Sequence, residues 1–295
     1  FNLVRYVSKD MHGWRFDWDR LARDIAPVVR AMDNVVDRAR YPLPQQEHEA
    51  KSKRRMGRGV TGRANAGGAL GLPYGSEGFL SFTRRVLTLL RDEAYIASAL
   101  LAKEKGAFPL YDPAYLESAF VRTLPVEVRD LIEAHGVRNS HLLSIAPTGT
   151  ISLCADNVSS GLEPVFSYGM ERTVIDEAGP SKELIEDYGV RVLGVRGKRS
   201  SEVTVAEHVA VLAVASKLVD SAVSKTCNVD SCVSWDEFKR VYDSAWELGC
   251  KGITTYRADG KRGGVIVAKD DDTGKAQEEA ASCSIDPETG RRSCE

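Results

Sequence analysis

The chain has 295 residues, of which 43% are hydrophobic and 28% are charged, and its formal net charge is −2 at pH 7. This balance argues against nucleic acid or an anionic membrane as the main partner, because both need a clustered positive excess. No run of about 18 uncharged apolar residues occurs, so we expect no membrane-spanning helix. The sequence also shows neither a secretory signal nor an initiating Met, and we expect a piece of a longer cytoplasmic protein.

The cysteines and histidines form no metal or disulfide pattern. Six cysteines are too few for a disulfide scaffold of this length, and no Cys-x-x-Cys is present. The five histidines are scattered without ligand spacing. We therefore expect no structural zinc and a reducing compartment.

The beginning of the chain is predicted to be one strand and one long helix. Residues 1–7 favour a strand. Apolar residues at spacings of three and four predict a helix over residues 17–40, with Pro27 inside it and a Pro-x-Pro sequence ending it. Residues 46–57 are polar and basic, which predicts an exposed crossing.

Further helices follow. One is predicted over residues 77–105, with Ser76 as N-cap and Gly106 as the stop, and a shorter one over residues 125–135. Two capping boxes predict the starts of two more: Thr204 with Glu207, and Ser234 with Glu237.

Beyond residue 138, strand-like runs alternate with these helices. Such runs cover residues 139–146, 163–174 and 252–256. Alternation without a meander of hairpins favours an α/β domain with parallel strands. From residue 269 the chain is polar and rich in acidic residues, which predicts a disordered tail.

The most informative segment is residues 138–166, RNSHLLSIAPTGTISLCADNVSSGLEPVF. A strand-like run leads into a turn from which a short helix can start. Such a turn offers consecutive N–H groups at the positive end of a helix dipole, and its glycine allows close approach of an oxyanion. A phosphate site and an ordinary capped turn both fit this pattern. The residues concerned are Pro147, Thr148, Gly149, Thr150 and Ile151.

The chain resembles the C-terminal half of a ribonucleotide reductase large (catalytic) subunit. The resemblance is carried, in the family's order, by FNLVRYV, by LGLPYGSEGFLSFTRRVLTLLRDEAYIASALLAKEKGAFPLYD, by the segment above, and by LVDSAVSKT and ELGCKGITTYRADGKRGGV. It implies that residues 147–151 hold the substrate phosphates through main-chain N–H groups. It also implies half of a ten-stranded α/β barrel over residues 1–268 and a flexible redox tail over residues 269–295.

The segment 61–71 departs from the family's more apolar helix. Arg63, Asn65, Gly67 and Gly68 each weaken a helix, at about 1 kcal/mol for an interior glycine. Local drift in a degenerate copy and a locally adapted loop both fit this composition.

The end of the barrel bears on how the radical is made. Family members served by a separate diiron radical subunit carry two adjacent tyrosines where this chain has Thr254 and Thr255, and only Tyr256 remains nearby. The sequence KGITTYR at residues 251–257, together with APTGTIS, is similar to that of the adenosylcobalamin-dependent class. The resemblance therefore implies that cofactor. We interpret Tyr256 as a half-buried strand aromatic rather than a redox group. The class with a separate subunit stays an alternative.

The family's radical cysteine, its Asn and Glu companions and the buried redox pair are expected before residue 1, so no catalytic residue is assigned in this chain. Cys154 is predicted to be a packing residue, and Cys227, Cys232 and Cys250 structural thiols. The resemblance implies that the other two cysteines, Cys283 and Cys294, reduce the buried pair by exchange; two incidental thiols are the alternative.

The sequence therefore predicts a fragment of a ribonucleoside diphosphate or triphosphate reductase that is inactive alone. The partners implied are a ribonucleotide, the N-terminal remainder of the enzyme, a thioredoxin- or glutaredoxin-like reductant and a second subunit of a homodimer. A non-catalytic remnant that binds nucleotides or a partner is the alternative.

Overall fold

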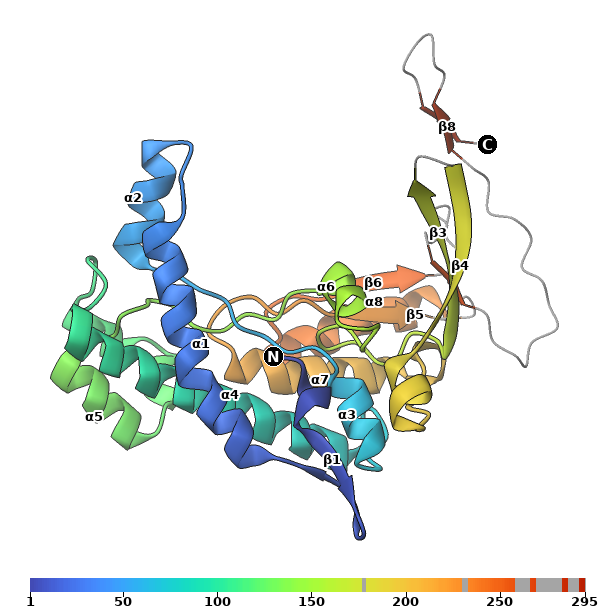
Figure 1. The fold of residues 1–295 in the computed structure, drawn as a ribbon, viewed down its shortest axis with the longest axis horizontal. Helices are drawn as coiled ribbons and strands as arrows, with labels where there is room; N and C mark the ends of the chain where they lie inside the picture. The colour runs from blue at the N-terminus through green and yellow to red at the C-terminus, as the bar shows by residue number, and fades with distance from the viewer. Residues whose placement is uncertain (177–178, 230–232, 258–265, 269–282, 286–291, 295) are drawn as a thin grey trace.

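A computed structural model describes residues 1–176, 179–229, 233–257, 266–268, 283–285 and 292–294 (Figure 1). Its α-helices are α1 (Trp18–Arg38), α2 (Pro44–Lys53), α3 (Arg63–Ala69), α4 (Glu77–Lys105), α5 (Val126–His135), α6 (Gly149–Cys154), α7 (Val205–Leu218) and α8 (Trp235–Glu247). Its strands are β1 (Val7–Asp10), β2 (Gly13–Phe16), β3 (Gly169–Asp176), β4 (Gly179–Glu186), β5 (Thr226–Val229), β6 (Thr254–Arg257), β7 (Ile266–Ala268), β8 (Cys283–Ile285) and β9 (Arg292–Cys294). Short 3-10 turns cover Leu3–Tyr6, Pro113–Glu117, Val121–Thr123 and Ser200–Glu202, and a π-helical turn covers Gly189–Leu193.

Five extended segments lie side by side in chain order and run parallel. Asn2 pairs with Thr61, Arg58 with Leu143, and Ile145 with Val223. The last segment is β6, which pairs in parallel with β5 over its whole length. This parallel ladder confirms the predicted α/β arrangement, and it places the carboxyl ends of all five segments at one edge.

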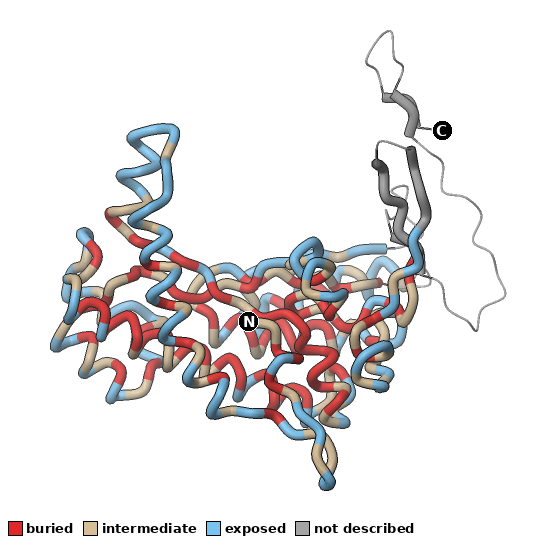
Figure 2. Tube along the Cα trace, viewed as in Figure 1, coloured by how far each residue is buried: buried red, intermediate tan, exposed pale blue. Residues whose placement is uncertain are grey.

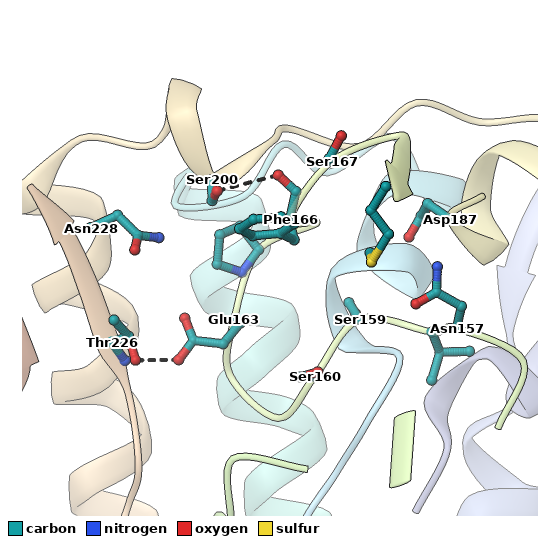
Figure 3. A pocket seen from close by; sticks show the side chains of 13 residues that line it. Asn157, Ser159, Ser160, Glu163, Phe166, Ser167, Asp187, Ser200, Thr226 and Asn228 are labelled. Carbon is teal, nitrogen blue, oxygen red and sulfur yellow. Dashed lines mark hydrogen bonds between the residues drawn. The ribbon is translucent and has the colours of Figure 1, made fainter. Parts of the chain in front are cut away.

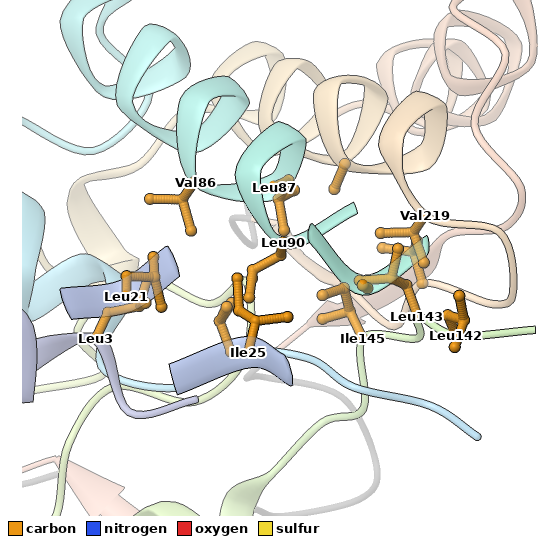
Figure 4. Packing of buried hydrophobic residues seen from close by; sticks show 14 of the residues in the cluster. Leu3, Leu21, Ile25, Val86, Leu87, Leu90, Leu142, Leu143, Ile145 and Val219 are labelled. Atoms are coloured by element: carbon orange, nitrogen blue, oxygen red, sulfur yellow. The ribbon is translucent and has the colours of Figure 1, made fainter. Parts of the chain in front are cut away.

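Helices cover the ladder and form the core. α4 contacts α1, α5 and α7, and Figure 1 shows it running along the molecule beside them. In Figure 4, Leu21 and Ile25 of α1 meet Leu87 and Leu90 of α4 next to the extended segment that carries Leu143. All five of these side chains are at most 1% exposed.

The predicted helix boundaries are largely confirmed. α1 continues through Pro27 without a break, and α4 has the expected limits, with the Ser76 hydroxyl accepting from the N–H of Phe79. Gly136 ends α5. Both capping boxes are formed, at the starts of α7 and α8. None of the helices in the described ranges has the length and apolar character that crossing a membrane would require.

Two local predictions near the start of the chain were wrong. Residues 1–7 do not form one strand, because a 3-10 turn follows the paired residues 1–3 and strand β1 starts only at Val7. Part of the predicted crossing at 46–57 is helix α2, which Pro44 starts at its first turn, where a missing N–H costs nothing. α2 is exposed along most of its length (Figure 2).

Antiparallel hairpins are also present. β1 pairs with β2, and β3 pairs with β4. The run predicted over residues 163–174 therefore divides into an irregular segment and strand β3, which begins at Gly169. The sequence did not indicate either hairpin, because the alternation of helices and strands dominated the pattern.

Helix α3 shows what the unusual residues at 61–71 do. The Arg63 side chain is fully buried and donates to the Thr83 hydroxyl at 2.6 Å and to the Leu162 carbonyl at 2.7 Å. A Cβ on Gly67 would lie 2.5 Å from the Phe79 ring, so only glycine fits there. The segment is thus a packed helix adapted to its surroundings, whereas the second of the two interpretations expected a locally adapted loop.

Candidate functional site

The turn at residues 147–151 lies at the carboxyl edge of the ladder. Thr148 has a left-handed backbone (φ 57°) and precedes α6, whose first intrahelical bond runs from the N–H of Ser152 to the Thr148 carbonyl at 2.8 Å. No side chain caps the helix, and Gly149, Thr150 and Ile151 are exposed. Their N–H groups belong to the first turn, which has no intrahelical acceptor, so they face solvent at the positive end of the helix.

A second loop, residues 160–166 (SGLEPVF), contacts this turn directly. The N–H of Gly161 donates to the Thr148 hydroxyl oxygen at 2.8 Å. Gly161 has φ +42°, and a Cβ there would lie 2.7 Å from the Ala146 carbonyl oxygen. Glycine is therefore required for the close approach, and the two blocks that carried the resemblance form one structural unit.

Beside this unit is a cavity of about 240 Å³. Figure 3 shows Glu163 of the second loop hydrogen-bonded to Thr226 of β5, near Asn228, with Ser160 and Phe166 of the same loop also on the lining. The remaining lining residues are Asn157, Val158, Ser159, Pro164, Ser167, Met170, Asp187 and Ser200. Residues 147–151 do not line the cavity, so the second loop is what connects the turn to it.

One wall of the cavity is held by a buried ion pair. Glu163 accepts from Lys225 Nζ at 2.6 Å and from the N–H of Thr226 at 2.8 Å. Lys225 has a fully buried side chain and also contacts His208 Nδ1 at 2.8 Å. Burial, and then the charge of Lys225, lowers the pKa of His208 to about 3, so the ring is neutral and accepts from the lysine.

The opposite wall is held by Asp187 and Asn65. The Asn65 amide donates to both carboxylate oxygens of Asp187, at 2.9 and 3.0 Å, and its own oxygen accepts from the N–H of Ser159 at 2.6 Å. Burial raises the pKa of Asp187, although the hydrogen bonds from Asn65 and from the N–H of Gly189 oppose it. Asn65, which weakens α3 by propensity, thus joins three segments at the cavity.

The predicted structural thiols occupy different environments. Cys227 is fully buried, and burial raises the pKa of its thiol to about 11. Burial also raises the pKa of Cys250. Both therefore stay protonated and unreactive at neutral pH, as expected of structural thiols. Cys154 is exposed at the end of α6, so the prediction that it packs in the interior was wrong. Cys232 lies outside the described residues.

The last described segments of the chain, β6, β8 and β9, add two observations. Cys283 and Cys294 are Cα partners across the β8–β9 pair, while most of the predicted 269–295 tail lies outside the described residues. On β6, the Thr255 hydroxyl shares a 2.8 Å hydrogen bond with the Tyr242 hydroxyl. Tyr256 keeps 38% of its surface exposed and is thus more open than the half-buried aromatic that we expected.

Comparison with known proteins identifies the class. The family model of the ribonucleotide reductase barrel domain matches residues 1–191 and 197–256. The chain therefore belongs to the ribonucleotide reductase family, and the resemblance seen in the sequence is confirmed.

Individual relatives refine this picture. The chain is 34% identical over 293 residues to a vitamin B12-dependent ribonucleoside-diphosphate reductase of Mycobacterium tuberculosis (strain CDC 1551 / Oshkosh), with 90% of this chain and 39% of the relative covered. It is 30% identical over 308 residues to a protein of the same name from Thermoplasma acidophilum, with 94% and 37% covered. A ribonucleoside-diphosphate reductase subunit alpha of Chlamydia pneumoniae is 30% identical over 190 residues, which cover 57% of this chain and 18% of the relative. The chain thus spans about two fifths of the length of the vitamin B12-dependent relatives.

Sequence reasoning missed the polar residues that hold the cavity walls in place. Lys225 stood inside the LVDSAVSKT block, but a lysine in a strand-like run carries no signal that it is buried. Asp187 and His208 were likewise not singled out. Their partners are 17 to 122 residues away in the chain, and only the fold brings them together.

Proposed function

We propose that this chain supplies the substrate phosphate site of a ribonucleotide reductase that converts ribonucleotides to deoxyribonucleotides by thiyl-radical chemistry. The observation that carries the proposal is the uncapped turn at residues 147–151, which presents three exposed N–H groups at the carboxyl edge of a parallel ladder. Phosphates bind well at such positions, because N–H groups and the helix dipole both favour negative charge.

The proposed phosphate contacts are Pro147, Thr148, Gly149, Thr150 and Ile151. Gly149 has no atom within 4 Å of where a Cβ would stand, so the space in front of the turn is open to a ligand. The Thr148 hydroxyl accepts from Gly161, which keeps its oxygen directed to the second loop. In this arrangement the backbone, rather than that hydroxyl, holds the phosphate.

The rest of the enzyme lies outside the residues assigned here. We propose that the five-segment ladder is half of a ten-stranded barrel and that an N-terminal remainder supplies the other strands, the radical cysteine and the buried redox pair. Residues 1–268 then form the barrel part and residues 269–295 a redox tail. In that tail, Cys283 and Cys294 would pass electrons from a thioredoxin- or glutaredoxin-like donor, within a homodimer of the complete enzyme.

We also propose that the complete enzyme depends on adenosylcobalamin. It is supported by the vitamin B12-dependent relatives and by Thr254 and Thr255 on β6. The residues described here do not by themselves fit the cofactor. The two cavities described beside the turn have volumes of about 240 and 440 Å³, which suit at most a small ligand within the roughly 300–1,000 Å³ range of drug-sized ligand sites, and a corrin ring with its nucleotide is larger than such a ligand. We therefore assign no cobalamin-binding residue in this chain.

The phosphate assignment is tested by changing charge without changing size. We expect Gly149→Asp to weaken binding of a ribonucleoside diphosphate at least tenfold, because a carboxylate would stand beside the N–H groups that the phosphate needs. Gly149→Asn is the matched control, since it adds the same volume without the charge. An acidic residue in the first turn suits a helix, so loss of binding would not reflect unfolding. Calorimetric titration showing that Gly149→Asp binds the nucleotide as well as the unmodified chain would contradict the assignment, and a larger loss in Gly149→Asp than in Gly149→Asn would assign the difference to charge.

A further inference from the structure

Lys225 is a buried cation that does not line the cavity. Its side chain is 0% exposed, and its ammonium group reaches three acceptors, namely a Glu163 carboxylate oxygen, the His208 ring and the Thr226 carbonyl. An ammonium has three N–H donors, so each is used. A buried charge that is fully paired in this way is costly to rearrange, which fixes its position.

Glu163 connects this fixed cation to the cavity. It lies in the second loop, lines the cavity and keeps 25% of its side chain exposed. One carboxylate oxygen accepts from Lys225, and the other accepts from the N–H of Thr226 at 2.8 Å. The two bonds fasten the loop to the start of β5, and the loop in turn contacts Thr148 through Gly161.

Within the part of the chain that the structure describes, Lys225 is the cation that pairs with Glu163, and the other basic groups nearby are engaged elsewhere. Arg63 is buried near it, but its guanidinium is hydrogen-bonded to Thr83 and Leu162 and packs 4.7 Å from the Phe79 ring. His208 is neutral, and its Nδ1 is occupied by Lys225. If Lys225 loses its charge, the Glu163 carboxylate therefore becomes an unpaired charge at the cavity wall.

We propose that Lys225 is a positioning residue, which holds Glu163 and the loop 160–166 in the arrangement that shapes the cavity and steadies the phosphate-binding turn. Lys225 acts through Glu163 and contacts no ligand. This inference rests on the proposed function, because the ligand is taken to be the nucleotide whose phosphates lie at residues 147–151.

The test uses the 295-residue chain with Lys225→Met, which keeps the length of the side chain and removes its charge. Lys251→Met is the matched control, because Lys251 also donates to main-chain carbonyls, those of Val219 and Ser221, but it does so at the amino edge of the ladder. Hydrogen exchange without nucleotide reports on the loop directly, since the Thr226 amide donates to Glu163.

We expect Lys225→Met to accelerate exchange at Thr226 and Gly161 at least tenfold, with the ladder amide of Ile145 unchanged and Lys251→Met without effect. Adding Glu163→Gln to Lys225→Met should restore most of the protection, because it removes the unpaired charge. Equal acceleration at Ile145, or no recovery in the double variant, would overturn the positioning role in favour of general packing.

Titration with ADP completes the test. We expect Lys225→Met to weaken ADP binding at least tenfold and the double variant to recover most of the affinity. Unchanged ADP affinity in Lys225→Met, despite faster exchange in the loop, would overturn the link to ligand binding. An unmodified chain that does not bind ADP would refute the proposed function, while the exchange data would still decide how the loop is held.

Discussion

Replacing Gly161 or Gly149 by alanine should change the free energy of unfolding in opposite directions. Gly161 has φ +42°, and a Cβ there would lie 2.7 Å from the Ala146 carbonyl oxygen. The left-handed conformation costs a non-glycine residue about 1–2 kcal/mol, and relieving the overlap by moving backbone costs a further ~1–3 kcal/mol. We therefore expect Gly161→Ala to lower the free energy of unfolding by about 2–5 kcal/mol.

Gly149 is the matched comparison. It starts α6, and its Cβ would meet no atom within 4 Å. Replacing a glycine in an ordinary backbone conformation restricts the unfolded chain, so Gly149→Ala should stabilise the protein by about 0.4–1 kcal/mol. The new methyl group stands in the open space assigned to the phosphate, however, and we expect it to weaken nucleotide binding.

Urea denaturation and calorimetric titration of both variants separate these effects. The expected pattern is a less stable protein for Gly161→Ala, and a more stable protein with poorer nucleotide binding for Gly149→Ala. A neutral Gly161→Ala variant would refute the close approach between the two loops. Stronger or unchanged binding in Gly149→Ala would refute the location of the phosphate.

Four further outcomes are expected. Replacing Cys283 and Cys294 by Ser in the completed enzyme should stop turnover with a thioredoxin donor but spare turnover with dithiothreitol; equal loss with both would place these thiols in another role. Turnover of the completed enzyme should require adenosylcobalamin. Activity with a diiron subunit and no cobalamin would instead place the enzyme in the class served by a separate radical subunit. The chain without an N-terminal half should show no deoxynucleotide formation and should aggregate on heating, which assays with and without that half would check. Asp33 is buried, but the hydrogen bonds and charge of Arg54 outweigh that burial and hold the pKa of the carboxyl below its usual value; its contribution to stability should be complete above about pH 4 and lost as pH falls, so acid titration should destabilise the wild type more than Asp33→Asn.

The sequence predicted the regular elements well where local signals were strong. Ser76 and Gly106 set the limits of α4 because capping and left-handed termination depend on nearby residues alone. The APTGTIS and SGLEPVF segments were recognised from their sequences. The structure shows that they are in contact, since the N–H of Gly161 donates to the Thr148 hydroxyl.

Tertiary contacts decided the elements that the sequence missed. Helix α3 forms despite two glycines and a buried arginine, because the Phe79 ring fills the space beside Gly67 and the Thr83 hydroxyl and Leu162 carbonyl accept from the two terminal nitrogens of Arg63. Helix α2 has few apolar residues and forms from Pro44 onward on the exposed side of the molecule. Lys225 and Asp187 gained their roles from partners far away in the chain, which propensity and periodicity do not report.

The order of the segments in the ladder allows the chain to fold while it is being synthesised. Each of the five extended segments pairs with the one made just before it, from residues 1–3 through to β6. A ribosome therefore releases every new segment next to a neighbour that already has a pairing edge, and the ladder can grow in the direction of synthesis. The turn that we propose to bind phosphate is complete in sequence when residue 151 emerges. If Lys225 holds the adjoining loop as we propose, this turn becomes rigid only after residue 225 has been made.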